Sequence, residues 1–598
     1  MKKILYFTVA IAMGTFQACS ELLDPETGLP GALTEDEVIY SYGNVQQMLT
    51  IIYASLPDGF QYIGNEAMLA GASDEAEFTS ELNLIQKFNT GDWNAVSNPD
   101  RAWANNFKGI YNANLYLQKV DSIRLDNLKL NPSPAAQEQY QTALERINRS
   151  KYEARFLRAF FYFELAKRYG GVPIMTEPLT LESDFTAIPR ATLDETIQFI
   201  VDECDSTVTV LPVKYEDFSL GHATKGAALA LKSRVLLYAA SDLFNDPSWA
   251  GGYAHPEYIS LSQDKSREQR WIDAAAAANE VINLVDEKGA TTYAITGLDY
   301  GTSFRTFQNI ELIFARRYGN SNEFEKTNYP IGYDKGNSGL TPLGNLVDDY
   351  EFLNGTAFDW DNPAHRANPY SNRDLRLTKS ILVNNALFNG GRGENRSRPV
   401  EIWTGGLDGK GVQKASRTGY YLLKYMDPNL DLLKDQSSVH TWALFRFGEI
   451  LLNYAEAVNE AYGAAGKVPG AKYTVKQALN LVRGRAGLGV VPPPVNTKDA
   501  MRDLIRHERR VELALEDHRL WDVRRWKDDV KYGAKATLGA PARAVEIIKT
   551  GVTETGEPVF EYKPFILENR KWEDKMFFYP IPQKELGIAK EWVQNPLW

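Results

Sequence analysis

The chain has 598 residues, of which 44% are hydrophobic and 24% are charged, and its formal net charge at pH 7 is −11. This length exceeds that of one simple domain, and the composition is that of a folded globular protein. The acidic balance argues against general nucleic-acid binding, which requires a basic surface. Aromatic residues make up 12% of the chain, so we expect some of the rings to have a task other than filling the core.

The N-terminus has the pattern of an export signal. Lys2 and Lys3 precede an apolar run at residues 4–18 that is too short to span a bilayer. A small residue, Ala18, then precedes Cys19. The pattern resembles a bacterial lipoprotein signal and predicts a signal peptide at residues 1–18 and lipidation of Cys19. An ordinary secretory signal with a chance cysteine is the alternative. If Cys19 is lipidated, Cys204 has no thiol partner in the mature chain.

Residues 151–169 predict a helix with two apolar faces. Spacing at 3.6 residues per turn puts apolar side chains on opposite sides, with one face formed by Tyr152, Phe156, Phe160 and Phe163 and the other by Ala154, Leu157, Phe161 and Leu165. A surface helix has a single apolar stripe, so this helix is expected to pack on both sides, as helices do in stacked repeats. Gly170, Gly171 and Pro173 are expected to end it.

Further helices with small residues at close-packing positions are predicted at residues 223–244, 271–286, 444–462 and 476–486. Alanine alternating with larger tyrosine or phenylalanine is typical of tetratricopeptide-type helix pairs, although the spacing here is irregular. We therefore predict a mainly α fold, with one body at residues 19–598 and helical repeats at about residues 40–290 and 440–530.

The composition changes at residues 293–436, which are rich in Gly, Asn, Asp and aromatic residues and show little helical periodicity. Such segments predict long ordered loops or short hairpins. Loops mounted on a rigid frame are where binding residues concentrate, so we expect this region to hold the binding site. Residues 60–98 have a similar composition on a smaller scale.

Two C-terminal segments are expected to be structural. Residues 505–526 carry many acidic and basic side chains at one-turn spacing, where opposite charges pair along a helix surface. We interpret the segment as one charged structural helix that locks to its neighbours. Pro580 and Pro582 favour an extended chain, and residues 560–598 are expected to clamp the end of the chain onto the body.

Five stretches together resemble the SusD/RagB family of outer-membrane lipoproteins. They are the signal with Cys19 and LLDPE, RFLRAFFYFELAKRYGGVP, RFGEILLNYAEAVNE with LVRGRAGL, IRHERRVELALEDHRLWDVRRW, and FYPIPQKELGIAKEWVQNPLW. They occur in the family's order over nearly the whole chain. The resemblance implies a tetratricopeptide-like scaffold with an irregular ligand-binding face, on the surface of a Gram-negative bacterium. It also implies capture of glycans for import through a SusC-like TonB-dependent transporter, although some members bind other nutrients.

The motifs of common enzyme classes do not occur in the sequence. The six histidines form no zinc motif, and there is no nucleophile elbow or phosphate-binding loop. Residues 427–431 alternate oxygen ligands but lack the Gly and Glu of an EF-hand, so no cofactor is expected and a structural calcium ion in the loops is left open. A glycosidase needs only two carboxylates that flank a sugar. Candidate pairs occur among Asp74, Glu75, Glu77, Asp359 and Asp361. Their spacing does not distinguish catalysis from hydrogen bonding to sugar hydroxyls or from solvation of a loop. We expect a non-enzyme, with a glycoside hydrolase and a protein-only scaffold as alternatives.

Candidate ligand residues follow from the chemistry of sugars. A sugar ring offers an apolar face to aromatic rings and a rim of hydroxyls to carboxylates and guanidinium groups. Trp93, on a polar loop, and Asp74, near it in sequence, are the first candidates. The resemblance implies that loops in the middle of the chain complete the site, which adds Phe324, Tyr333, Trp360, Arg373 and Trp403.

Overall fold

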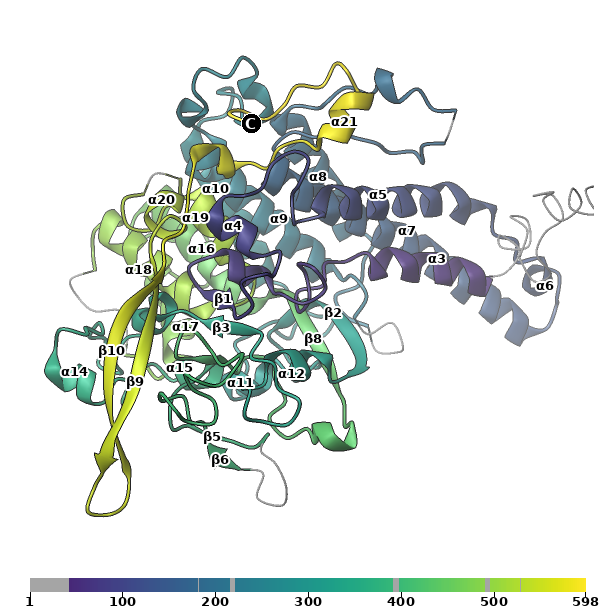
Figure 1. The fold of residues 1–598 in the computed structure, drawn as a ribbon. Coiled ribbons are helices and arrows are strands. Elements are labelled where there is room, and N and C mark those ends of the chain that lie inside the picture. The colour runs from purple at the N-terminus through teal and green to yellow at the C-terminus, as the bar shows by residue number, and fades with distance from the viewer. Residues whose placement is uncertain (1–41, 181, 216–220, 391–396, 490–494, 528) are drawn as a thin grey trace, which may run out of the picture.

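The computed structural model describes residues 42–180, 182–215, 221–390, 397–489, 495–527 and 529–598. The predicted signal peptide and Cys19 lie outside the described residues. Figure 1 shows a layer of helices with a loop-rich region beside it, and its element labels are used below. No helix in the described ranges has both the length and the apolar character that crossing a bilayer requires.

The helices of the first half pack against one another in chain order. They are α3 (Tyr42–Ala54), α5 (Ala102–Lys119), α7 (Pro134–Tyr169), α8 (Leu193–Val208), α9 (Lys225–Ala240) and α10 (Arg267–Ile282). Helix α5 contacts α7, α7 contacts α8, α8 contacts α9, and α9 contacts α10. Serial packing of neighbouring helices is the arrangement of tetratricopeptide-like repeats, so the predicted mainly α, helical-repeat scaffold is confirmed.

The scaffold continues across a long insertion. Helix α16 (Phe447–Tyr462) packs on α10, although residues 283–446 separate them. Helices α17 (Val475–Arg485) and α18 (Lys498–Glu512) then pack on α16. The loop-rich region therefore leaves the scaffold after α10 and returns at α16.

The remaining helices are short. They are α4 (Gln86–Thr90), α6 (Asp126–Lys129), α11 (Tyr300–Ser303), α12 (Glu323–Asn328), α13 (Gly344–Asp349), α14 (Pro363–Ala367), α15 (Leu377–Ser380), α19 (Arg519–Arg525), α20 (Ala534–Thr537) and α21 (Gln583–Ile588). Five of them, α11 to α15, lie in the loop-rich region.

The strands pair as antiparallel two-stranded sheets. The pairs are β1 (Ala76–Phe78) with β3 (Leu340–Pro342), β2 (Leu312–Ser321) with β8 (Ser438–Arg446), β4 (Ile381–Leu382) with β7 (Tyr421–Leu422), β5 (Leu387–Phe388) with β6 (Arg398–Pro399), and β9 (Ala542–Val552) with β10 (Pro558–Glu568). The β1–β3 pair joins an N-terminal loop to the middle of the chain, with Glu77 opposite Thr341. The β9–β10 hairpin reaches away from the helices (Figure 1).

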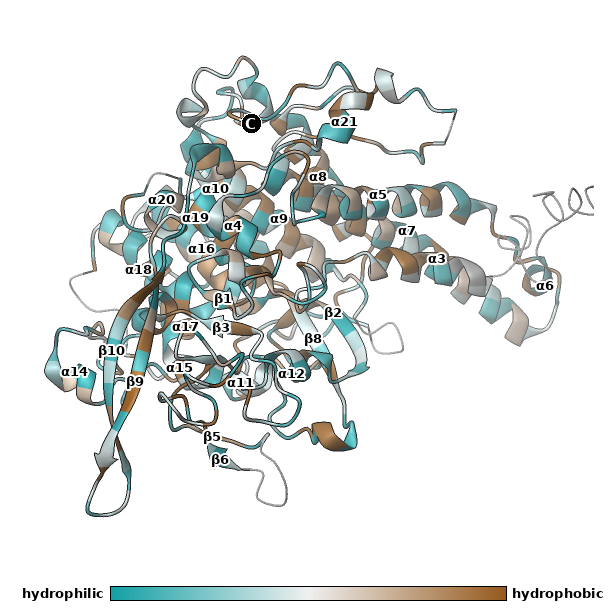
Figure 2. Cartoon of the chain, viewed as in Figure 1, coloured by the Kyte–Doolittle hydropathy of each residue, from teal (hydrophilic) through white to brown (hydrophobic). Residues whose placement is uncertain are grey.

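Helix α7 is packed on both sides, as predicted. On the α5 side, Phe161 lies so close that a Cβ on Gly109 would be 2.6 Å from its ring. On other sides, Phe163 contacts Tyr238 of α9 at a ring-centroid distance of 5.2 Å, and Phe156 contacts Phe314 of β2 at 5.1 Å. Figure 2 shows hydrophobic residues along the central helices, and also on the β9–β10 hairpin.

Helix α7 ends at Gly170, also as predicted. Gly170 has φ +77°, and a Cβ there would collide with the backbone carbonyl oxygen of Tyr258. Only glycine satisfies both conditions without strain. The chain therefore turns here because of one residue whose role is readable from the sequence.

The interpretation of residues 505–526 as one continuous helix is wrong, whereas the structure shows the predicted locking to neighbouring elements. The segment forms α18 and α19, separated by a turn in which Leu515 and Asp517 have positive φ angles of +64° and +61°. Most of its charged side chains are buried. They pair with one another, as Arg509 does with Asp522, and with distant residues, as Arg510 does with Asp74, because a buried charge requires a close partner of opposite sign.

Two of the distant partners, Arg376 and Arg446, come from the insertion at residues 283–446. Arg376 donates to Glu508 and Glu512 of α18 at 2.7 Å each. Arg446 donates to Glu512 and Glu516, both at 2.7 Å. These contacts fix the loops to the second half of the scaffold.

The C-terminal segment lies against α7. The backbone N–H of Tyr579 donates to the carbonyl oxygen of Arg168 at 2.6 Å. The side chain of Asn595 donates to the carbonyl oxygens of Tyr169 and Tyr579 at 3.0 and 2.7 Å. Residues far apart in the sequence thus share one buried layer at the end of α7.

Candidate functional site

The fold separates the seven predicted ligand residues into two groups. Trp360 and Trp403 are half-buried. The other five are buried, namely Asp74, Trp93, Phe324, Tyr333 and Arg373. Their individual contacts show which of them can meet a ligand.

Trp93 is a core residue, so the expectation that its ring faces solvent is wrong. Only 3% of it is exposed. Its ring packs on Phe88, Tyr579 and Trp598 at centroid distances of 5.2, 5.0 and 4.7 Å. The C-terminal segment covers it, which no pattern around residue 93 indicates.

Phe324 and Tyr333 are also core residues, against the prediction that they face a ligand. The Phe324 ring lies 4.7 Å from that of Phe60. The hydroxyl of Tyr333 donates to the carbonyl oxygen of Arg398 at 3.0 Å, and the Arg398 guanidinium lies 3.9 Å from the Tyr333 ring centroid. Both aromatic side chains therefore stabilise the loop-rich region from within.

Arg373 holds a loop in place instead of reaching a ligand. Its guanidinium donates to the carbonyl oxygens of Val347, Tyr350 and Pro369 at 2.7 Å each. It also lies 4.2 Å from the ring centroid of Phe358. Burial lowers the pKa of Arg373 to about 10. The predicted contact of this side chain with sugar hydroxyls is wrong, because its nitrogens bind the backbone.

Trp403 lies at the β9–β10 hairpin. Its ring centroid is 5.3 Å from that of Phe560, and the Lys549 ammonium lies 5.3 Å from its ring. The structure places it outside the cavity described next.

Trp360 and Asp74 line one cavity of about 690 Å³, which we call the loop cavity. Its walls come from α13, α18, α20 and the loop at residues 357–361. Its aromatic lining is Phe358, Trp360 and Tyr532. The volume is in the range typical of small-molecule sites.

Trp360 is fixed at the wall of the loop cavity by α13. Its Nε1 donates to Oδ1 of Asp348 at 2.9 Å, and Asp348 Oδ2 pairs with Arg543 at 3.0 Å. The ring of Phe358 stands at 87° to that of Trp360, with centroids 4.9 Å apart. Burial raises the pKa of Asp348 to about 6, and its two partners oppose this shift.

Asp74 joins three parts of the chain under the cavity. Its Oδ1 accepts from Arg510 Nη1 at 2.8 Å and from Arg519 Nε at 2.9 Å, and its Oδ2 accepts from Arg519 Nη2 at 2.9 Å. Burial favours its neutral form, but the two guanidinium groups outweigh burial and hold the pKa of Asp74 well below its usual range. Both oxygens are thus engaged, so the predicted role as a free hydroxyl acceptor is wrong.

Asp359 and Asp361 flank Trp360, and both are exposed. One oxygen of Asp359 accepts from the backbone N–H of Asp361 at 2.8 Å. Neither carboxylate forms an ion pair with any residue that the structure describes. The sequence indicated these two residues only as carboxylates that could form a pair. The fold places both of them at the loop cavity.

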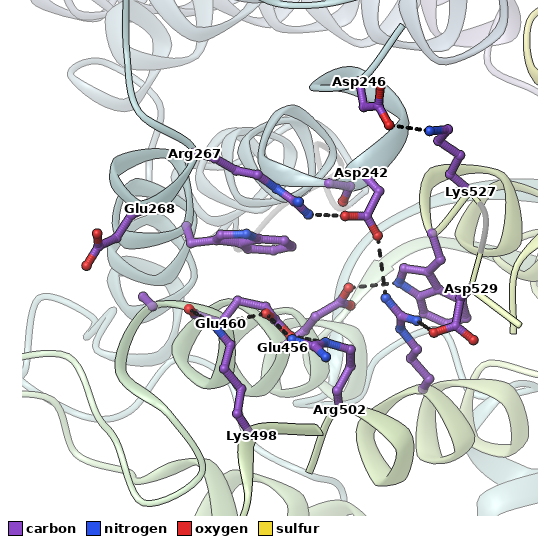
Figure 3. A pocket seen from close by; sticks show the side chains of 15 residues that line it. Asp242, Asp246, Arg267, Glu268, Glu456, Glu460, Lys498, Arg502, Lys527 and Asp529 are labelled. Atoms are coloured by element: carbon purple, nitrogen blue, oxygen red, sulfur yellow. Dashed lines mark hydrogen bonds and ion pairs between the residues drawn. The ribbon is translucent and has the colours of Figure 1, made fainter. Parts of the chain in front are cut away.

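A second cavity of about 730 Å³ lies between α10, α16 and α18. Figure 3 shows Arg267 pointing toward Asp242 and Lys527 toward Asp246, whereas Glu268 points away from the other charged side chains. Its two tryptophans, Trp271 and Trp526, are only 6% and 2% exposed. This cavity offers neither an open ring face nor an excess of one charge, so the loop cavity is the better candidate site.

Metal-binding clusters are not found in the part of the chain that the structure describes, where no three His, Cys, Asp or Glu side chains gather suitably. The structural calcium ion left open by the sequence stays a prediction.

Sequence reasoning missed several residues of the loop cavity. Asp348, Arg543 and Tyr532 line it, and no local pattern distinguishes them from other polar or aromatic residues. They come from α13, from the start of β9 and from the segment before α20. Only the tertiary fold brings them to Trp360.

Fold and cavity describe a helical-repeat protein with a cavity lined mainly by loops and short helices. A model of the SusD family matches residues 310–598, and a model described as "Starch-binding associating with outer membrane" matches residues 33–237. The chain belongs to the SusD/RagB family. It is 23% identical over 532 residues to SusD-like protein P25 of Formosa agariphila, covering 85% of this chain and 87% of the relative, and 23% identical to SusD-like protein P38 of the same organism, covering 86% and 90%.

Solved structures share the fold. A SusD-like protein from Bacteroides fragilis matches with a TM-score of 0.73 and 24% identity, over 94% of this chain and 99% of that one. A SusD-like carbohydrate-binding protein from the same species matches with a TM-score of 0.65 and 24% identity, over 92% of this chain and 99% of that one. A laminarin-binding SusD-like protein matches with a TM-score of 0.59 and 20% identity, over 93% of this chain and 99% of that one. At these identities the likeness concerns the fold.

Proposed function

We propose that this protein captures a glycan at the outer membrane, in the loop cavity, and delivers it to a SusC-like TonB-dependent transporter. The observation that carries the proposal is the half-exposed Trp360, which lines a cavity of about 690 Å³ and is flanked by two exposed carboxylates without ion pairs among the described residues. The family matches support the same class of ligand.

The chemistry of the cavity suits a sugar. The indole of Trp360 can stack on the apolar face of a sugar ring. Asp359 and Asp361 can accept hydrogen bonds from hydroxyl groups at its rim. Because Asp348 and Phe358 contact the indole directly, little side-chain freedom is lost when a ligand binds.

The location follows from two lines of support. The family model that matches residues 33–237 is described as associating with the outer membrane. The sequence pattern before Cys19 predicts a lipid anchor there. The family resemblance supports a transporter as the partner. In this proposal, the anchored protein delivers its ligand to that transporter.

We propose binding without hydrolysis. Glycoside hydrolysis requires one carboxylic acid and a second carboxylate on either side of the scissile bond. Asp348, whose pKa is raised to about 6, is the cavity's natural candidate for the acid. However, both of its oxygens are engaged, one by Trp360 and one by Arg543, which supports a structural role.

Affinity electrophoresis tests the proposal. The purified protein is run through gels that contain plant, microbial or host polysaccharides, beside the Trp360→Ala and Trp403→Ala variants. We expect retardation by one class of polymer, loss of retardation in Trp360→Ala, and retention in Trp403→Ala, a matched control outside the cavity. Unchanged mobility of the wild-type protein in every gel would refute glycan capture, and loss only in Trp403→Ala would move the site to the hairpin.

A further inference from the structure

Two carboxylates of the loop cavity have no cationic partner among the described residues. Four of its acidic residues already have cationic partners, which are Arg510 and Arg519 for Asp74, Arg543 for Asp348, Arg510 for Asp349, and Arg483 for Glu351. A fifth, Asp503, has Lys531 at 3.8 Å. The remaining two are Asp359 and Asp361. The cavity is therefore negative at the loop that carries Asp359, Trp360 and Asp361.

Trp360 between two carboxylates is suited to a cation. The face of an indole attracts an ammonium group through its quadrupole, and the attraction grows when water is displaced. The carboxylates of Asp359 and Asp361, which line the same cavity, can add charge-assisted hydrogen bonds to a bound cation. The ring is held by the bond from Nε1 to Asp348.

A second, independent feature points to an oxygen-bearing ligand. Arg519 lines the same cavity, and only 5% of its side chain is exposed. Its Nε and Nη2 donate to Asp74, but its Nη1 has no hydrogen-bond partner among the described residues. A buried guanidinium donor without an acceptor is costly, so we expect a small shift of the Arg519 side chain to bring its Nη1 to a hydroxyl, ring or glycosidic oxygen of a ligand.

We propose that the loop cavity selects a glycan that carries an amino sugar with a free, unacetylated amine. The ammonium group binds at Asp359, Trp360 and Asp361, and a sugar oxygen accepts from Arg519. This inference rests on the proposed function, because it names the ligand class of the same site.

The same arrangement disfavours acidic glycans. A uronate carboxylate would meet Asp359 and Asp361, which have no ion pair among the described residues, while Arg543 is already paired with Asp348. The chain as a whole carries a net charge of −11, which slows the approach of a polyanion. An N-acetylated sugar keeps its hydroxyls but loses the charge that the two carboxylates attract.

Isothermal titration calorimetry with three oligosaccharides of equal length tests this selectivity. The probes are an unacetylated glucosamine oligomer, its N-acetylated counterpart and an oligogalacturonate, at low salt and at a pH where the amine is protonated. For the purified protein we expect the unacetylated oligomer to bind about tenfold more tightly than the acetylated one. Its affinity should fall with added salt, because part of the attraction is electrostatic.

Two double variants separate the site from overall charge. Asp359→Asn combined with Asp361→Asn should remove the preference for the free amine. Glu554→Gln combined with Glu557→Gln changes the net charge equally at the exposed turn of the β9–β10 hairpin, and should keep the preference. Loss of the preference in both double variants would overturn the site-specific inference.

The outcomes also distinguish this inference from the function on which it rests. Equal or tighter binding of the acetylated or acidic oligomer, lost in Trp360→Ala, would overturn the inference and leave glycan capture standing. Failure of every carbohydrate to bind would overturn both. Binding of a lysine-rich peptide that needs Asp359 and Asp361, with no carbohydrate binding, would likewise overturn both and make the cavity a protein-binding site.

Discussion

Replacing Asp74 with asparagine should destabilise the protein strongly, although the two side chains have nearly the same shape. Asp74 is 6% exposed and accepts three hydrogen bonds from the guanidinium groups of Arg510 and Arg519. In the variant, the amide nitrogen must face one of these donors, and the negative charge is lost. Arg510 keeps a second partner, Asp349 at 2.9 Å, whereas Asp74 is the acceptor for both bonded nitrogens of Arg519.

The size of the effect follows from the burial of both partners. Removing one member of a buried ion pair costs about 3–5 kcal/mol, because the other charge remains out of water without compensation. Arg519 has 5% of its side chain exposed, and Arg510 has 1%. We therefore expect Asp74→Asn to lower the free energy of unfolding by about 3–5 kcal/mol.

Urea unfolding followed by tryptophan fluorescence measures this loss, with Asp359→Asn as the control, since Asp359 is an exposed aspartate at the same cavity. The partners lower the pKa of Asp74 in the folded state below its ordinary value of 3.8. The stabilisation is therefore present above pH 3.8, and it declines as the pH falls below that value and the unfolded carboxyl binds a proton that the folded one does not. A loss at neutral pH no larger than that of Asp359→Asn would refute the reasoning.

Three further predictions concern the half-buried Asp517, the N-terminal anchor and the transporter. Burial raises the pKa of Asp517 to about 8 from 3.8, so stability should fall by about 1.4 kcal/mol per pH unit as the pH rises between these values. Asp517→Asn should gain stability over the wild type between about pH 5 and about pH 7, and a constant difference between the two urea midpoints would contradict this. For the anchor, Cys19→Ser should move the protein from the outer-membrane fraction to the soluble fraction of cells, and a TonB-dependent transporter should co-purify with the wild type from solubilised membranes. Unchanged fractionation, or purified wild type without a transporter, would overturn the anchor or the partner respectively.

The scaffold was predictable because its signals are local. The two apolar faces of α7 follow from the spacing of Phe156, Phe160 and Phe161, since helical periodicity fixes which side chains share a face. Gly170 marks the helix end for an equally local reason, its positive φ. Neither argument needs knowledge of the neighbouring helices, only that neighbours exist.

The charged and aromatic residues were misplaced because their partners are remote. In residues 505–526, helical spacing suggests pairs along one surface, but Glu508 and Glu512 bond to Arg376, more than a hundred residues away. Trp93 is similarly covered by Trp598 from the other end of the chain. A charge or a ring in a polar stretch looks exposed in a sequence until the fold supplies its cover.

The candidate site was only partly predictable, because some of its contacts are local and others are remote. Trp360 could be chosen because an aromatic residue between two aspartates in a Gly/Asn-rich loop has little local core to join. Its hydrogen-bond partner, Asp348, lies only 12 residues earlier, but Arg543, which orients Asp348, comes from β9. The sequence therefore indicates the ring of the site, while its geometry depends on contacts across the whole chain.

The buried charges explain how an insertion of loops can form a binding cavity. Residues 283–446 leave the scaffold at α10 and return at α16, so their position is not fixed by helix packing alone. Arg376 and Arg446 bind them to α18 and the turn after it, and Asp74 binds the N-terminal loop to Arg510 and Arg519. Apolar contacts could hold the same segments together, but they are non-directional, whereas each guanidinium fork fixes an orientation. The cavity that Trp360 lines lies between the segments held in this way, so its shape is set by the folded chain before any ligand arrives, which lowers the cost of binding.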